Sequence, residues 1–229
     1  MTVVSSLDSS QQILPVKVCG ITRLEDGLMA VESGAAALGF IFYPPSPRFK
    51  APEMVADLIE SIREKVSADF KAVGVFVDAA TEEMNSISAQ CGLDWIQLHG
   101  SEPAEIMTEL NTPSYRAFRM KEVSEVAIAE EAPDEMILLD TYDPDHYGGT
   151  GKPFNWEWAK RISKNKKVIL AGGLTPENVA RASQAVSPAG LDLSSGVEVS
   201  PGIKDAAKVA AFFQALREVG FSGASPWSV

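Results

Sequence analysis

Two side chains that can exchange protons stand where apolar runs of the sequence end. Cys19 follows Val16-Lys17-Val18, and Asp140 closes the run 136–139. A thiolate can act as a nucleophile or as a base, and a carboxyl group can act as an acid. Taken singly, the cysteine could be a buried core residue and the aspartate could cap loop amides. Taken together, they suit a base and an acid that act on one substrate.

Two loops rich in small residues suggest a second kind of chemistry. Gly172-Gly173 ends the apolar run that starts at Lys167, and Ser194-Ser195-Gly196 ends the run that starts at Gly190. Glycine lets the backbone approach a ligand closely, and backbone amides of such loops bind phosphate. One loop of this kind would be an ordinary turn, whereas the two together favour a phosphate site.

These residues must be positioned by elements that alternate along the chain. Eight apolar runs indicate strands buried on both faces, and they lie at 16–20, 36–42, 71–77, 93–99, 115–120, 135–140, 167–172 and 190–195. Helical patterns follow many of them. One covers 54–66 behind Pro52, one starts at Thr175-Pro176-Glu177, and the last is marked from Ile203 to Leu216.

The order of these elements predicts the fold class. Eight strand–helix units in 229 residues suit an α/β protein with a single-domain (β/α)8 TIM barrel at residues 15–219. A doubly wound open sheet is the rival, but its glycine-rich nucleotide turn is missing after the first strand. Residues 1–14 read as a flexible N-terminal extension, 141–152 as a loop and 220–229 as a loose C-terminal tail.

Composition excludes several classes of protein. A net charge of −11 argues against nucleic-acid binding and against a membrane-surface role, because both need a basic face. The two cysteines, Cys19 and Cys91, form no redox or metal pair, which is typical of a reducing compartment and favours the cytoplasm. His99 and His146 have no metal-ligand spacing, and Cys91 reads as structural.

In a barrel of this kind the active site lies at the carboxyl ends of the strands. Besides the residues named above, this rule selects Arg48, Asp78 and His99. Asp78 has no assigned role. His99, taken alone, reads as a hydrogen-bonded rim residue.

A series of motifs, in order over residues 16–218, resembles the phosphoribosylanthranilate isomerase family of tryptophan biosynthesis. The motifs are KVCGIT at 17–22, GFIFYPPSPR at 39–48, VGVFV at 73–77, QLHG at 97–100, LLDT at 138–141, YGGTGKPFNW at 147–156, GGLTPENV at 172–179 and LDLSSGVEVSPGIKD at 191–205. Each string is weak by itself, and the ordered set is specific.

The resemblance implies an Amadori rearrangement of N-(5′-phosphoribosyl)anthranilate without cofactor or metal. It makes Asp140 the general acid, Cys19 the general base and Arg48 the partner of the substrate carboxylate. It assigns the phosphate to Gly172, Gly173, Ser195 and Gly196, and it places His99 and Asp192 near the substrate. A monomer and a homodimer both stay open. The alternatives are an isomerase of a related phosphoribosyl intermediate, which would pair two aspartates, and a non-catalytic phosphosugar-binding barrel.

Overall fold

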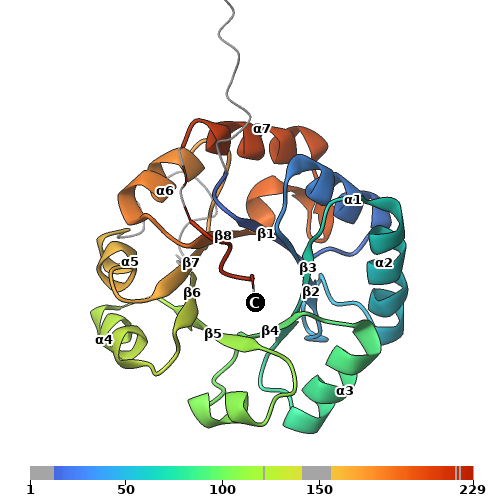
Figure 1. Cartoon of the computed structure of the whole chain (residues 1–229), viewed down its shortest axis with the longest axis horizontal. Coiled ribbons are helices and arrows are strands. Elements are labelled where there is room, and N and C mark those ends of the chain that lie inside the picture. Colours follow the sequence, from blue (N-terminus) through green and yellow to red (C-terminus); the bar gives the residue numbers. More distant parts are fainter. Residues whose placement is uncertain (1–12, 121, 141–155, 220, 222, 229) are drawn as a thin grey trace, which may run out of the picture.

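The computed structural model describes residues 13–120, 122–140, 156–219, 221 and 223–228. Eight parallel strands form a closed barrel in chain order, with β8 hydrogen-bonded back to β1 (Figure 1). They are β1 (Val16–Cys19), β2 (Ala37–Ile41), β3 (Lys71–Phe76), β4 (Trp95–Leu98), β5 (Ser114–Arg119), β6 (Met136–Asp140), β7 (Lys167–Ala171) and β8 (Gly190–Leu193). The predicted barrel and its eight strands are confirmed.

Helices cover the outside of the ring (Figure 1). They are α1 (Leu24–Ser33), α2 (Pro52–Lys65), α3 (Thr81–Cys91), α4 (Val123–Glu131), α5 (Trp156–Ile162), α6 (Val179–Val186) and α7 (Ala206–Arg217). Between β4 and β5 the crossover contains a short 3-10 helix, η1 (Ala104–Thr108), where the other crossovers contain an α-helix.

The strands alternate between two apolar environments, as side chains on a pleated strand must. Outward residues such as Val18, Phe40 and Leu139 belong to the large core beneath the helices. Inward residues such as Val73 and Leu138 form a smaller cluster inside the barrel. Because both faces are buried, the strands read as continuous apolar runs in the sequence.

Two predicted helix starts are wrong. Helix α6 begins at Val179, because the side chain of Asn178 closes a turn first: it accepts from the Thr175 amide at 2.9 Å and donates to the Gly173 carbonyl at 2.8 Å. Ile203 lies outside α7, in a small hairpin of β9 (Glu198–Ser200) and β10 (Ile203–Lys204). Asp205 then caps α7 by accepting from two backbone amides.

The C-terminal segment closes the amino-terminal end of the barrel. It runs back from α7 to the centre of the ring (Figure 1), where Trp227 is fully buried among inward residues of the strands. A Cβ atom at Gly190 would lie 2.9 Å from Pro226, so this glycine gives the segment room. The interpretation of residues 220–229 as a loose tail is therefore wrong for Trp227.

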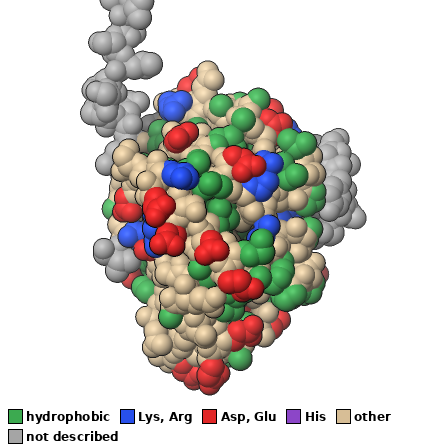
Figure 2. Space-filling model, turned by 90° about the vertical axis from the view of Figure 1, so that its right-hand side faces the viewer, with side chains coloured by type: hydrophobic (Ala, Val, Ile, Leu, Met, Phe, Trp, Pro, Cys, Tyr) green, Lys and Arg blue, Asp and Glu red, His purple; other side chains and the backbone are tan. Residues whose placement is uncertain are grey.

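Acidic and basic side chains are interspersed on the side of the barrel that α2 covers (Figure 2). Among the described residues, no helix has the length and apolar character needed to cross a membrane. The predicted extension lies outside the described residues over 1–12, and so does the predicted loop at 141–152.

Candidate active site

A cavity of about 340 Å³ opens at the carboxyl ends of the strands. Every residue that the sequence assigned to catalysis or substrate binding lines it, namely Cys19, Arg48, His99, Asp140, Gly172, Gly173, Asp192, Ser195 and Gly196. Asp78, which had no assigned role, is not part of this lining; its carboxylate accepts from the Ser101 amide at 2.7 Å. The barrel thus gathers residues that are far apart in the sequence around one space.

Cys19 ends β1 and points into the barrel beside a buried ion pair. A Cβ atom at Gly39 would lie 2.8 Å from the Cys19 Sγ and 2.9 Å from the Lys17 Cε, so the missing side chain makes room for both. The Lys17 ammonium donates to Asp192 Oδ1 at 3.0 Å. Burial raises the pKa of the Cys19 thiol, while the positive charge of Lys17 acts in the opposite direction.

Asp140 ends β6 and begins a line of polar side chains that continues over the neighbouring strands β4 and β5. Its Oδ2 lies 3.5 Å from Nε2 of His99, and the other ring nitrogen of His99 lies 2.9 Å from Gln97 Nε2. The hydroxyl of Tyr115 donates to Gln97 Oε1 at 3.0 Å. Since these contacts fix the imidazole from both sides, His99 is oriented toward Asp140.

The loops after β7 and β8 bring backbone amides to the same rim. Gly172 and Gly173 have φ angles of +83° and +59°, which glycine adopts without strain. A Cβ atom at Gly196 would lie 1.8 Å from the carbonyl oxygen of Leu174. Gly196 is therefore required for the close contact between the two loops, and this contact makes one concave surface of them.

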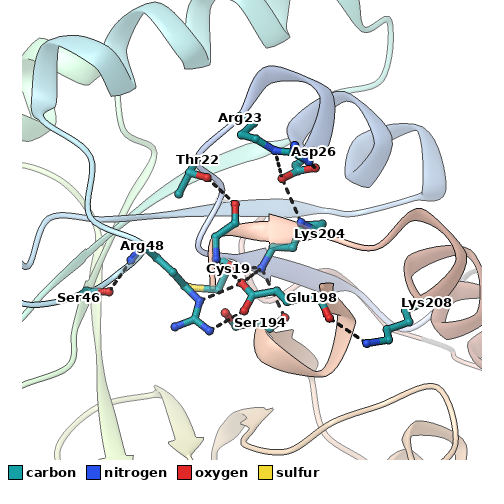
Figure 3. Close-up of polar contacts among 11 residues, drawn as sticks. Cys19, Thr22, Arg23, Asp26, Ser46, Arg48, Ser194, Glu198, Lys204 and Lys208 are labelled. Carbon is teal, nitrogen blue, oxygen red and sulfur yellow. Dashed lines mark hydrogen bonds and ion pairs between the residues drawn. The ribbon is translucent and has the colours of Figure 1, made fainter. Parts of the chain in front are cut away.

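Arg48 lies over the same cavity, but it already has an anionic partner. Its Nε and Nη2 donate to the two carboxylate oxygens of Glu198 at 2.9 and 2.5 Å (Figure 3). Lys204 also donates to Glu198, at 2.8 Å. The expectation for Arg48 considered a substrate carboxylate alone and did not foresee this ion pair.

Sequence reasoning missed Lys17, Gln97, Glu198 and Lys204. A signal existed for Lys17 and Gln97, because each is a polar residue inside an otherwise apolar strand. Glu198 and Lys204 carried none, because they lie in a hairpin after β8 that was interpreted as loop and helix. Among the described residues, no group of three or more His, Cys, Asp or Glu side chains could hold a metal ion.

Comparison with known proteins agrees with this geometry. Residues 16–215 match the family described as N-(5′-phosphoribosyl)anthranilate (PRA) isomerase. The N-(5′-phosphoribosyl)anthranilate isomerase of Geotalea uraniireducens is 47% identical over 199 residues, which cover 87% of this chain and 96% of the relative. That of Trichlorobacter lovleyi is 44% identical over 207 residues, covering 90% and 99%.

Solved structures give the same result. The phosphoribosyl anthranilate isomerase of Thermotoga maritima has a TM-score of 0.82 and 37% identity, covering 90% of this chain and all of that one. Another structure of such an isomerase, in complex with reduced 1-(o-carboxyphenylamino)-1-deoxyribulose 5-phosphate, has a TM-score of 0.79 and 33% identity over the same shares. This chain therefore belongs to the N-(5′-phosphoribosyl)anthranilate isomerase family, and it is an isomerase of tryptophan biosynthesis.

Proposed function

We propose that this protein converts N-(5′-phosphoribosyl)anthranilate to 1-(2-carboxyphenylamino)-1-deoxyribulose 5-phosphate, with Asp140 as general acid and Cys19 as general base. The observation that carries the proposal is that the thiol and the carboxyl group line one cavity with a guanidinium and two glycine-bearing loops. The substrate offers a matching set of groups: a ribose ring to be opened, a carboxylate and a phosphate.

The reaction is a sequence of proton transfers. Asp140 gives a proton to the ribose ring oxygen, the bond from that oxygen to C1′ breaks, and C1′ becomes an iminium carbon. Cys19 takes the proton from C2′, whose bonding electrons neutralise the iminium and form an enolamine. The enolamine then gains a proton at C1′ and loses one from the C2′ hydroxyl, which leaves the ketose. The rearrangement oxidises one carbon of the substrate and reduces its neighbour, so it requires no external oxidant or reductant, and we propose that it proceeds without cofactor or metal.

Substrate binding would divide between the two ends of the cavity. The loops after β7 and β8 would hold the phosphate through the amides of Gly172, Gly173, Ser195 and Gly196, which is the usual phosphate position in such barrels. Arg48 would hold the carboxylate at the other end. His99 and Asp192 would lie beside the reacting carbons. His99 contacts the proposed acid Asp140, and Asp192 accepts a hydrogen bond from Lys17, which lies next to the proposed base Cys19.

The surroundings of Cys19 suit a base that is protonated at rest. Burial raises the pKa of the thiol, so proton removal must be assisted by the nearby cations and by the substrate itself, whose iminium makes the C2′ proton more acidic. A non-catalytic phosphosugar-binding barrel would not need this arrangement of thiol and carboxyl group. Two aspartates, expected for isomerases of related intermediates, are replaced here by the pair Cys19 and Asp140.

The test is the fluorescence of phosphoribosylanthranilate after addition of the purified protein in the presence of EDTA. We expect the fluorescence to decay at a rate proportional to the enzyme concentration, with the ketose as product. An unchanged signal would refute the isomerase activity, and activity that EDTA abolishes would refute the metal-free chemistry.

Two further points belong to the same proposal. We place the enzyme in the cytoplasm, which is supported by the two free cysteines in the described chain. For its assembly we keep the choice between monomer and homodimer, because one similar structure is that of monomers generated from a dimeric isomerase of Thermotoga maritima. Light scattering on the purified protein decides between the two masses.

A further inference from the structure

We propose that Glu198 is a positioning residue of the isomerase: it orients the guanidinium of Arg48 for the substrate carboxylate, and the buried Lys204 ties Glu198 to the strand that ends in Cys19. This inference rests on the roles proposed above for Arg48 and Cys19. It adds to them a pair of residues in the hairpin after β8 (Figure 3).

The contact between Glu198 and Arg48 has a fixed geometry. Two parallel hydrogen bonds, from Nε at 2.9 Å and from Nη2 at 2.5 Å, hold the guanidinium in the plane of the carboxylate. The stem of Arg48 lies against the Cys19–Gly20 turn, where a Cβ atom at Gly20 would be 2.5 Å from the Arg48 Cδ. Both the plane and the path of the arginine are therefore set before substrate arrives.

Lys204 connects this pair to the catalytic strand. Its ammonium donates to the Cys19 carbonyl at 2.6 Å, to Glu198 at 2.8 Å and to the Ser194 carbonyl at 3.4 Å. These three acceptors match the three donors of an ammonium group, and the Lys204 side chain is completely buried. The ends of β1 and β8 and the partner of Arg48 thus meet at one nitrogen.

The charges of the three side chains favour an anionic ligand. Burial alone would raise the pKa of Glu198, but hydrogen bonds from Arg48 and Lys204 hold it below its usual value. Glu198 is therefore a carboxylate that accepts and cannot donate. Burial lowers the pKa of the Lys204 ammonium, and its hydrogen bond to Glu198 acts in the opposite direction. With both cations charged, the cluster carries one surplus positive charge, which favours an anionic substrate in a protein with a net charge of −11.

A purely structural ion pair is the competing explanation, and the molecule contains a matched example of one. Arg116 donates to Asp134 through the same two nitrogens at 3.0 and 2.5 Å. The side-chain exposures are 16% and 1%, against 19% and 4% for Arg48 and Glu198. Asp134, however, precedes β6 at the amino-terminal end of the barrel, where it borders a different cavity.

The test is a double-mutant cycle in which steady-state kinetics and the thermal midpoint are measured for Glu198→Gln, Arg48→Ala and the double variant, with Asp134→Asn as control. Glutamine keeps the size of the side chain and removes its charge. We expect Glu198→Gln to raise KM about 10-fold with kcat changed less than about 3-fold. In the Arg48→Ala background the same change should alter KM by less than about 2-fold, because the guanidinium that Glu198 orients is no longer there.

Asp134→Asn should lower the thermal midpoint by about as much as Glu198→Gln does, because the two ion pairs are similarly buried. It should leave kcat/KM within about 2-fold of wild type. If Glu198→Gln does not fold, Glu198→Asp enters the cycle instead, and the retracted carboxylate should raise KM about 3-fold only when Arg48 is present. Additive effects, or an unchanged KM, would overturn the inference. An inactive wild-type protein would instead refute the isomerase activity on which the inference rests.

Discussion

The two ends of the barrel use the same architecture for opposite purposes. At the carboxyl end the interior holds a thiol, a carboxyl group, an imidazole and the buried pair of Lys17 and Asp192. At the amino end the inward positions carry apolar side chains, and the indole of Trp227 fills the centre. The first end exposes the proposed catalytic polar groups to a cavity, whereas at the second the buried indole packs among inward apolar side chains.

This contrast indicates where stability and activity are separable. Burial of apolar surface at the amino end stabilises the ring, and nothing in the proposed reaction uses it. At the carboxyl end, groups such as Lys17, Asp192 and Lys204 lose hydration on burial, a cost that ion pairs offset only in part. Variants at the amino end should change unfolding and leave kinetics unchanged, whereas variants around the carboxyl-end cavity should change kinetics, with an added loss of stability where they break a buried ion pair.

Replacement of Asp140 by asparagine should have the largest effect on kinetics. The amide cannot supply the proton that opens the ribose ring, so kcat should fall by about 10² or more, the usual scale for a general acid. The matched control is Asp78→Asn, the same change at a rim position outside the cavity lining, with an expected change in kcat below about 3-fold. Equal losses of kcat in the two variants would show that Asp140 acts on the structure of the rim and not as a proton donor.

Replacement of Trp227 by alanine should have the largest effect on stability. Deleting a buried indole costs about 3 kcal/mol or more in a protein core. Urea unfolding followed by circular dichroism measures the loss. We expect kcat/KM within about 2-fold of wild type, and a drop comparable to that of Asp140→Asn would mean that the two ends are coupled.

The pH dependence of kcat/KM should respond to Lys17. Its positive charge counteracts the rise that burial causes in the pKa of Cys19, so Lys17→Met should raise that pKa further. Because the thiolate is the basic form, the limb of the profile that rises with pH should move to higher pH. Lys167→Met, at the amino end of β7, is the control and should leave the profile in place. If the rising limb of the profile stays at the same pH in Lys17→Met, the group that titrates in that limb is not Cys19.

The sequence was sufficient for the ring and for the residues that line its mouth, because their signals are local. Each strand is an apolar run, and most of the assigned residues lie at the end of such a run or in the loop that follows it, whereas Gln97 inside β4 was missed. The contacts of Glu198 and Trp227 could not be predicted from local sequence patterns, because their partners are distant in the sequence. Glu198 meets Arg48 150 residues away, and Trp227 fills a space that exists only after the strands have closed.

Two interpretations failed because local patterns competed. Ile203 continues the apolar stripe of the last helix in the sequence, yet it pairs with Ser200 in the hairpin. Thr175-Pro176 is a good helix start by residue type, but Asn178 bonds to backbone groups of the preceding turn and delays the helix to Val179. Such hydrogen bonds from side chains to the backbone readily shift the residue at which a helix begins.

The role of Cys19 as the base is tested most simply by kcat of Cys19→Ala beside that of Cys91→Ala. Both cysteines are buried to similar extents, with 6% and 4% of their surface exposed. Cys91, however, lies at the end of α3, where its thiol donates a hydrogen bond to the Pro52 carbonyl. If Cys19 is the base, its alanine variant should lose about 10²-fold or more in kcat while keeping its fold, and Cys91→Ala should stay within about 2-fold. A folded Cys19→Ala protein with a wild-type rate would show that another group removes the C2′ proton.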